Sequence, residues 1–200
     1  GDPRWWPQGI SDPHEAHPSG QELLLTTWYA KTLGDERNQG SRLSLVDVGA
    51  RRYEHVLLVE PRPGRAEGAA PTWRPLKIHA GGLVWWGDWV HVAATRNGFA
   101  TCHLDDLVRV PEDRRAEFFG HSWVLPMRIA HRAVTPAGTE PLRYSFLSLD
   151  LDDPAAPMLV VGEYGRGKQT TRLTRFPLDP TTRLPALGDD DRCRCAEVLD

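Results

Sequence analysis

The stretch "GGLVWWGDWVHVAATRNGFATCHLDDL", residues 81–107, decides the class of fold. Two turn signals, Gly-Asp at 87–88 and Asn-Gly at 97–98, divide it into three apolar runs. Because the runs are short and rich in valine and aromatic residues, they favour strands over helices. We therefore predict three consecutive antiparallel strands, the last of which ends in a Leu-Asp pair.

Two further segments repeat this pattern. Residues 144–179, "YSFLSLDLDD…PMLVVGEYGRGK…TTRLTRFPLD", again end in Leu-Asp, and residues 6–60 contain "WPQGISD…ELLLTTWYA…SRLSLVDVG…YEHVLLVE". Units of roughly 45–60 residues are typical of propeller blades. We predict an all-β chain of about three β-propeller-like blades, each of roughly three to four antiparallel strands. A small open barrel or sandwich is the alternative.

The turn-forming residues and the composition indicate the rest of the organisation. Residues 1–185 are predicted to form a single domain and residues 186–200 a polar tail, with one short helix at 111–121. The net charge of −3 gives no electrostatic case for nucleic acid, and no apolar run reaches the length of a membrane helix. We expect neither nucleic acid nor a membrane as a partner.

The segment "MLVVGEYGRGKQTTRLTRF", residues 158–176, resembles a phosphate-binding loop with one departure. Gly162 is followed after four residues by Gly-Lys at 167–168, but Gln169 stands where a hydroxyl should ligate magnesium. The residues after the loop alternate as a strand does, which leaves no helix N-terminus for a phosphate. The pattern favours a β-hairpin.

Four short segments carry a family resemblance. "WPQGI", "YEHVLLVEP", "PLKIHAGGLVWWG" and "FPLD" resemble a group of predicted secreted actinobacterial β-propeller-like proteins of unassigned activity. The resemblance implies a propeller fold, further blades beyond these three, and secretion. The opening "GDPRWWPQGI" is not a signal peptide, and the composition is also compatible with the cytoplasm.

About three blades cannot close a ring, and open blades leave strand edges unpaired. Two copies joined head to tail, or a second chain that supplies the missing blades, would close it. A smaller barrel or sandwich would avoid the problem.

In a propeller, the starts of the inner strands line a central channel, which predicts the site. Gln8, His79 and Tyr144 or Ser145 would lie near its axis. His79 is followed by Ala-Gly-Gly, which allows close approach of a backbone or ligand, and an imidazole serves as acid or base near neutral pH. The alternative is a structural histidine bonded to the backbone of a neighbouring blade.

Further candidates stand beside His79. Glu163 would be a carboxylate partner of His79 or Arg143, or else a solvated hairpin residue. The residues expected to bind the ligand are Trp6, Trp28, Trp86, Arg143 and Tyr144, with Trp85 a further member of an aromatic wall. Packing between blades is the alternative for the tryptophans, and the alternation of a strand makes at least one of Trp85 and Trp86 a core residue.

We predict no metal and no cofactor. The pair in "HEAH", His14 and His17, lies between prolines without a third ligand, and Cys193 with Cys195 is an incomplete zinc site. Cys102 is expected to be a buried thiol. His91 and His103 lie in neighbouring strands, where they would face each other, but no carboxylate accompanies them.

Two classes of function remain open. The first is an enzyme, a lyase, cyclase or hydrolase, that acts by acid–base chemistry on a carbohydrate or secondary metabolite, with His79 assisted by Gln8 and Glu163. The second is a non-catalytic module that binds a glycan, peptide or protein. In either case the chain could be half of an obligate assembly.

Overall fold

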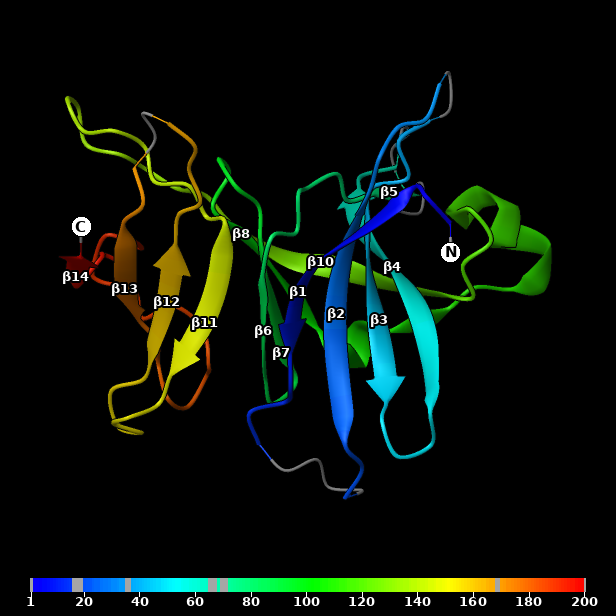
Figure 1. Cartoon of the computed structure of the whole chain (residues 1–200), viewed down its shortest axis with the longest axis horizontal. Coiled ribbons are helices and arrows are strands. Elements are labelled where there is room, and N and C mark those ends of the chain that lie inside the picture. The colour runs from blue at the N-terminus through cyan, green and yellow to red at the C-terminus, as the bar shows by residue number, and fades with distance from the viewer. Residues whose placement is uncertain are drawn as a thin grey trace.

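The computed structural model of the chain contains three groups of antiparallel strands that follow one another in sequence (Figure 1). The structure describes residues 2–15, 20–34, 37–64, 68, 72–167 and 170–199. No helix in these ranges is long and apolar enough to cross a membrane. The prediction of an all-β chain is confirmed.

The first unit is a meander of four strands. They are β1 (Trp5–Ser11), β2 (Leu23–Ala30), β3 (Ser41–Asp47) and β4 (Arg52–Arg62), and β5 (Thr72–Pro75) extends the outer edge at β4. Leu23, Leu25 and Thr27 of β2 are buried in alternation, as a sheet with one face on a core requires. The register of β1 shifts between Pro7 and Ile10, which is a β-bulge at Gln8 and Gly9.

The second unit contains the hairpins predicted from residues 81–107. Its strands are β6 (Leu83–Trp86), β7 (Trp89–Ala93), β8 (Phe99–His103) and β10 (Trp123–His131). The two turns need positive φ angles, which Gly87 at 58° and Gly98 at 83° supply. Between β8 and β10 lie η1 (Leu104–Asp106), β9 (Val108–Arg109) and η2 (Glu112–Phe118). The predicted short helix is therefore present, as the 3-10 helix η2.

The third unit contains β11 (Phe146–Asp150), β12 (Met158–Gly162), β13 (Leu173–Pro177) and β14 (Glu197–Leu199). β12 and β13 are antiparallel, with Gly162 opposite Leu173, so the segment that resembles a phosphate loop is a hairpin as predicted. Lys168 and Gln169 lie outside the described residues. Within the predicted polar tail, β14 adds a strand to this sheet.

The first two units join into one nearly closed, barrel-like sheet. β10 bridges them, because its first half pairs in parallel with β4 and its second half pairs with β8. On the other side β1 lies against β6, where the backbone N–H of Trp85 donates to Ser11 Oγ at 3.1 Å. This arrangement matches the open-barrel alternative, and separate propeller blades are not confirmed. The reason is the length of β10, which lets one strand serve two units.

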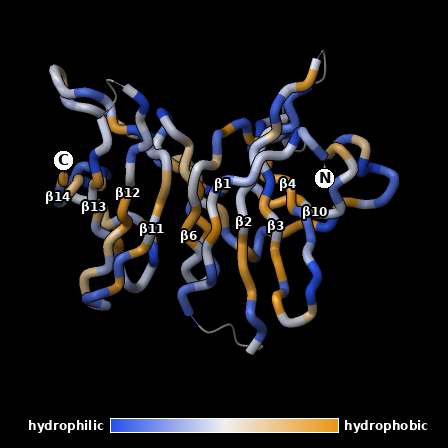
Figure 2. The backbone as a smooth tube through the Cα atoms, in the orientation of Figure 1, coloured by the Kyte–Doolittle hydropathy of each residue, from blue (hydrophilic) through white to orange (hydrophobic). Residues whose placement is uncertain are grey.

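The second unit has a hydrophobic core on each of its two faces. Trp85 packs in the core shared with the first unit, and Trp86 packs in the core shared with the third. Both indoles are buried, so the expectation that at least one belongs to the core is confirmed. A third cluster around Trp5 lies under η2, whose Phe118 covers it. Figure 2 shows hydrophobic colour along β3, β6 and β11, the strands that face these cores.

Candidate functional site

The first strands of the three units meet in the structure, where the second half of β1 lies against the starts of β6 and β11. A Cβ atom on Gly9 would lie 2.7 Å from the Cα of Gly82, and one on Gly82 would lie 2.6 Å from the backbone nitrogen of Leu147. Gly81 abuts the carbonyl of Ser145 in the same way. The glycines after His79 therefore admit neighbouring backbone. These contacts bring together the segments that carry Gln8, His79 and Ser145, and the joint role predicted for the three residues stays a prediction.

Buried hydroxyls fix the backbone on both sides of His79. Ser41 Oγ donates to the Ile78 carbonyl at 2.6 Å, and Thr27 Oγ1 donates to the Ala80 carbonyl at 2.8 Å. Ser41 and Thr27 are fully buried. Ala80 has a φ of 53°, a left-handed conformation that costs an L-residue about 1–2 kcal/mol. His79 is thus presented from a strained backbone that its neighbours hold in place.

The ring of His79 lies against the ring of Tyr29. Their centroids are 4.5 Å apart and their planes differ by 35°. Neither the His79 imidazole nor the Tyr29 hydroxyl makes a hydrogen bond within the described part of the chain. The hydrogen bond to backbone that a structural histidine would make is therefore not seen there. Both polar groups are available to a ligand.

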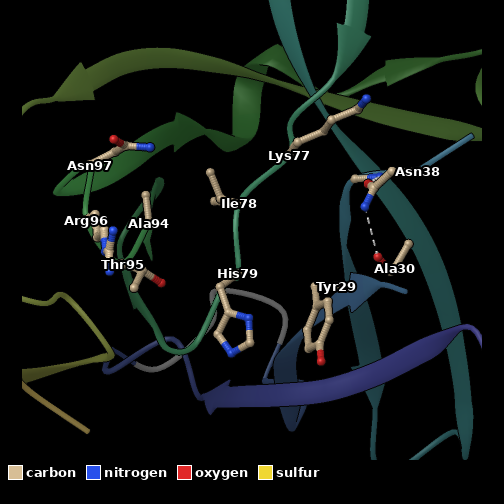
Figure 3. Close-up of a pocket in the computed structure, with 11 residues that line it drawn as sticks. Tyr29, Ala30, Asn38, Lys77, Ile78, His79, Ala94, Thr95, Arg96 and Asn97 are labelled. Carbon is tan, nitrogen blue, oxygen red and sulfur yellow. Dashed lines mark hydrogen bonds between the residues drawn. The ribbon is translucent and has the colours of Figure 1, made fainter. Parts of the chain in front are cut away.

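His79 and Tyr29 line an open cleft of about 400 Å³ between the first and second units. Asn38 and Lys77 contribute to the side of Tyr29, and the turn at residues 94–97 forms the opposite side (Figure 3). The Asn38 amide is already used, because it donates to the Ala30 carbonyl at 3.2 Å and accepts the Gly40 N–H at 2.7 Å. Asn38 therefore shapes the cleft wall.

The turn opposite is anchored to the third unit. The backbone of Thr95 exchanges two hydrogen bonds with Tyr144, at 3.1 and 2.9 Å, although Thr95 has a φ of 54°. Its Oγ1 atom is shielded from solvent and has no hydrogen-bond partner among the residues described. Arg96 and Asn97, which follow, are exposed at the cleft. All three units therefore determine the shape of this site.

Glu163 lies elsewhere, in a buried ion pair. Its carboxylate accepts hydrogen bonds from Arg172 Nε at 3.0 Å and from the backbone N–H of Arg143 at 2.8 Å. Burial alone would raise the pKa of Glu163, but the hydrogen bonds from Arg172, Thr170 and Arg143 lower it to about 2. The residue neither lines the His79 cleft nor is solvated. Sequence analysis did not single out Arg172, its main partner.

The structure does not assemble the expected aromatic wall. Trp6 is exposed, with Lys31 Nζ 3.2 Å from its ring centroid, and it lies opposite Tyr29 in the register of β1 and β2. Trp28 lies on the opposite face of the β1–β2 strand pair, under the guanidinium group of Arg42. Trp86 is buried between units, where its indole donates to Glu15 at 3.1 Å.

Two other residues expected in the site lie outside the cleft and serve the fold. The Gln8 amide donates to the carbonyl of its neighbour Pro7 at 2.7 Å, within the bulge of β1. Tyr144 is buried in the core between the second and third units, where burial raises its pKa to about 12. Of the residues predicted for the site, the cleft therefore contains His79. Tyr29, Lys77 and Arg96 were missed, because nothing in their local sequence distinguishes them.

The described residues contain no group of three His, Cys, Asp or Glu side chains that could hold a metal. His14 lies 3.3 Å from Asp12, and His17 is outside the described residues. The expectation that His91 and His103 face each other is wrong, since His91 pairs with Thr101 and His103 with Trp89. The other cysteines are free, and Cys102 is a buried thiol as expected.

A second cleft, of about 440 Å³, lies at the opposite end of β3 and β4. Its Asp47 is occupied, because it accepts hydrogen bonds from Arg52 at 3.2 Å, from Gln21 at 3.3 Å and from the Ala50 N–H at 3.0 Å. The carboxylate of Asp47 is thus satisfied, whereas the His79 imidazole and the Tyr29 hydroxyl make no hydrogen bond with the described residues. The His79 cleft is therefore the better candidate site.

Comparison of the chain with protein-family models, curated proteins and solved structures finds no match. The function is therefore argued from the cleft.

Proposed function

We propose that this chain is a ligand-recognition module that binds a small polar ligand, in particular a sugar, in the His79 cleft. The observation that carries the proposal is the pair of His79 and Tyr29. Their polar atoms make no hydrogen bond within the part of the chain that the structure describes, and buried hydroxyls hold the backbone that carries His79. Preorganised polar groups of this kind beside an aromatic ring are the usual means of orienting a glycan or other polar ligand.

Recognition is favoured over chemistry by the residues that line the cleft. None of the described residues that line it carries a carboxylate, and Glu163, the acid predicted to assist His79, is held by Arg172 outside it. A general base in a glycan-processing site usually has a second acid or base nearby.

The acid–base enzyme is the second candidate, as a lyase, cyclase or hydrolase. The close approach of the His79 imidazole to the Tyr29 phenol supports it, since these two groups can exchange protons with one bound substrate. The lack of a third partner for this pair within the described residues places it second.

We propose a propeller-like arrangement that a second copy completes head to tail. The second unit is covered on both faces, as every blade of a closed ring is, and the first strands of all three units converge. The outer face of the third unit exposes Phe146, Leu173 and Leu199 in one row. The first unit exposes Ile10 and Tyr53. A separate second chain that supplies blades is the alternative partner.

The binding proposal is tested with a panel of neutral and acidic mono- and oligosaccharides. Saturation-transfer difference NMR would detect binding to the wild type and to the Tyr29→Ala and His79→Ala variants, each checked for folding by circular dichroism. We expect at least one sugar to bind the wild type and to lose its signal in both variants. The same samples are then examined for product, because turnover that His79→Ala abolishes would establish the enzyme instead. No signal from any sugar would refute recognition in this cleft.

A further inference from the structure

We propose that the ligand of the His79 cleft is an anion, an acidic sugar whose carboxylate is bound between Lys77 and Arg96. This inference rests on the proposed function and names the class of ligand. Among the eleven described residues that line the cleft, Lys77 and Arg96 are cationic and none is acidic. In Figure 3 they lie on opposite sides of the cleft, Arg96 in the turn at 94–97 and Lys77 on the segment that also carries His79, with its side chain on the side of Asn38.

The two cations differ from most of the arginines in pairing. Arg52, Arg74, Arg128, Arg175 and Arg183 each form an ion pair with an Asp or Glu side chain. Lys77 and Arg96 form no such pair with any carboxylate of the described ranges, and both are exposed. The whole chain carries a net charge of −3. Unpaired positive charge at a cleft of an otherwise acidic protein attracts a small anion.

The remaining groups of the cleft suit the neutral part of a sugar. The Tyr29 ring offers an apolar face for the C–H groups of a pyranose, and the His79 nitrogens and the Asn97 amide offer hydrogen bonds to hydroxyls. Two cations are too few for a polyanion such as nucleic acid, whose binding proteins present an extended basic surface. A monosaccharide carboxylate matches both the charge and the size.

The test compares two sugars that differ in one group. Methyl β-D-glucuronide carries a carboxylate where methyl β-D-glucoside carries a hydroxymethyl group. The dissociation constants for the wild type, Lys77→Ala, Arg96→Ala and the double variant are measured by titration of ¹H–¹⁵N NMR spectra. Arg51→Ala is the control, because Arg51 is an exposed cation in the turn between β3 and β4, at the end of the sheet opposite the cleft.

We expect the glucuronide to bind about tenfold more tightly than the glucoside, with the largest shifts at Tyr29, His79 and Asn97. Each single substitution should weaken glucuronide binding by about three- to tenfold, and the double variant should lose the preference. Arg51→Ala should bind as the wild type does. Raising the salt concentration should weaken the binding of the glucuronide and leave the affinity for the glucoside unchanged.

Different outcomes would overturn the anion inference and the recognition proposal. Equal binding of both sugars in this cleft would overturn the anion inference and leave the recognition proposal standing. Glucuronide binding that survives both substitutions would also overturn the anion inference. If neither sugar shifts the resonances of Tyr29 or His79, recognition of sugars in this cleft fails as well.

Discussion

The hydroxyl of Thr27 connects the fold to the candidate site, and its removal should affect both. It donates to the Ala80 carbonyl at 2.8 Å, next to His79, and it accepts the N–H of Gly9 at 2.9 Å. Gly9 lies in the bulge of β1, where the ladder to β2 is interrupted, so the hydroxyl replaces a missing sheet hydrogen bond. Thr27→Val has nearly the same shape and lacks this hydroxyl.

The cost of this substitution can be worked from the structure. Thr27 is 0% exposed, so neither the Ala80 carbonyl nor the Gly9 N–H gains water in exchange. A buried polar group left without a partner costs about 1–3 kcal/mol. Two such groups give a loss of about 2–6 kcal/mol in the free energy of unfolding. For a domain of this size, that corresponds to a fall in Tm of about 4–24 °C.

Urea unfolding followed by tryptophan fluorescence measures the loss. Thr27→Ser is the matched control, because it keeps the hydroxyl and loses a single methyl group, which costs about 1 kcal/mol. Thr27→Val should also weaken sugar binding, since it releases the carbonyl that follows His79. A valine variant that is as stable as the wild type would refute the claim that this hydroxyl braces the site.

Three further predictions follow from the structure. Burial lowers the pKa of His91 from 6.5 to about 4, so between these pH values the unfolded chain binds more protons than the folded one. Lowering the pH from 6.5 to 4 should therefore reduce the free energy of unfolding by about 3 kcal/mol through His91. Urea unfolding at a series of pH values should show this fall, and the same pH dependence in His91→Gln would contradict the prediction. Glu163→Gln should cost about 3 kcal/mol by removing the carboxylate that pairs with Arg172, yet leave sugar affinity unchanged; lost binding in a variant that calorimetry shows to be folded would assign Glu163 to the site instead. Light scattering at two concentrations should give the mass of a dimer, and Leu173→Asp should give the mass of a monomer; a wild type that is monomeric at both concentrations would refute ring closure by a second copy.

Much of the local architecture could be predicted from the sequence. The short apolar runs around Gly87 and Gly98 predicted the β6–β7–β8 meander, because such turns require positive φ angles and the strands alternate. The parallel pairing of β4 with β10 could not be predicted. It joins Val56 to Trp123 across 67 residues, and no local pattern identifies a partner so distant.

The site could be predicted only in part, because local sequence patterns identify single residues and not their distant neighbours. His79 was singled out because small residues follow it, in the segment that leads into β6. Tyr29 and Arg96 lie at the end of one strand and in one turn, and only the packing of two units brings them to His79. Glu163 was recognised as a notable acid, but its role depends on Arg172, which reaches it from the other arm of a hairpin.

A crystal structure of the protein soaked with methyl β-D-glucuronide tests the central claim most directly. The account predicts a sugar ring against Tyr29, within reach of His79, and a carboxylate between Lys77 and Arg96. A sugar bound at the Asp47 cleft or over the exposed face of Trp6, with the His79 cleft empty, would contradict it.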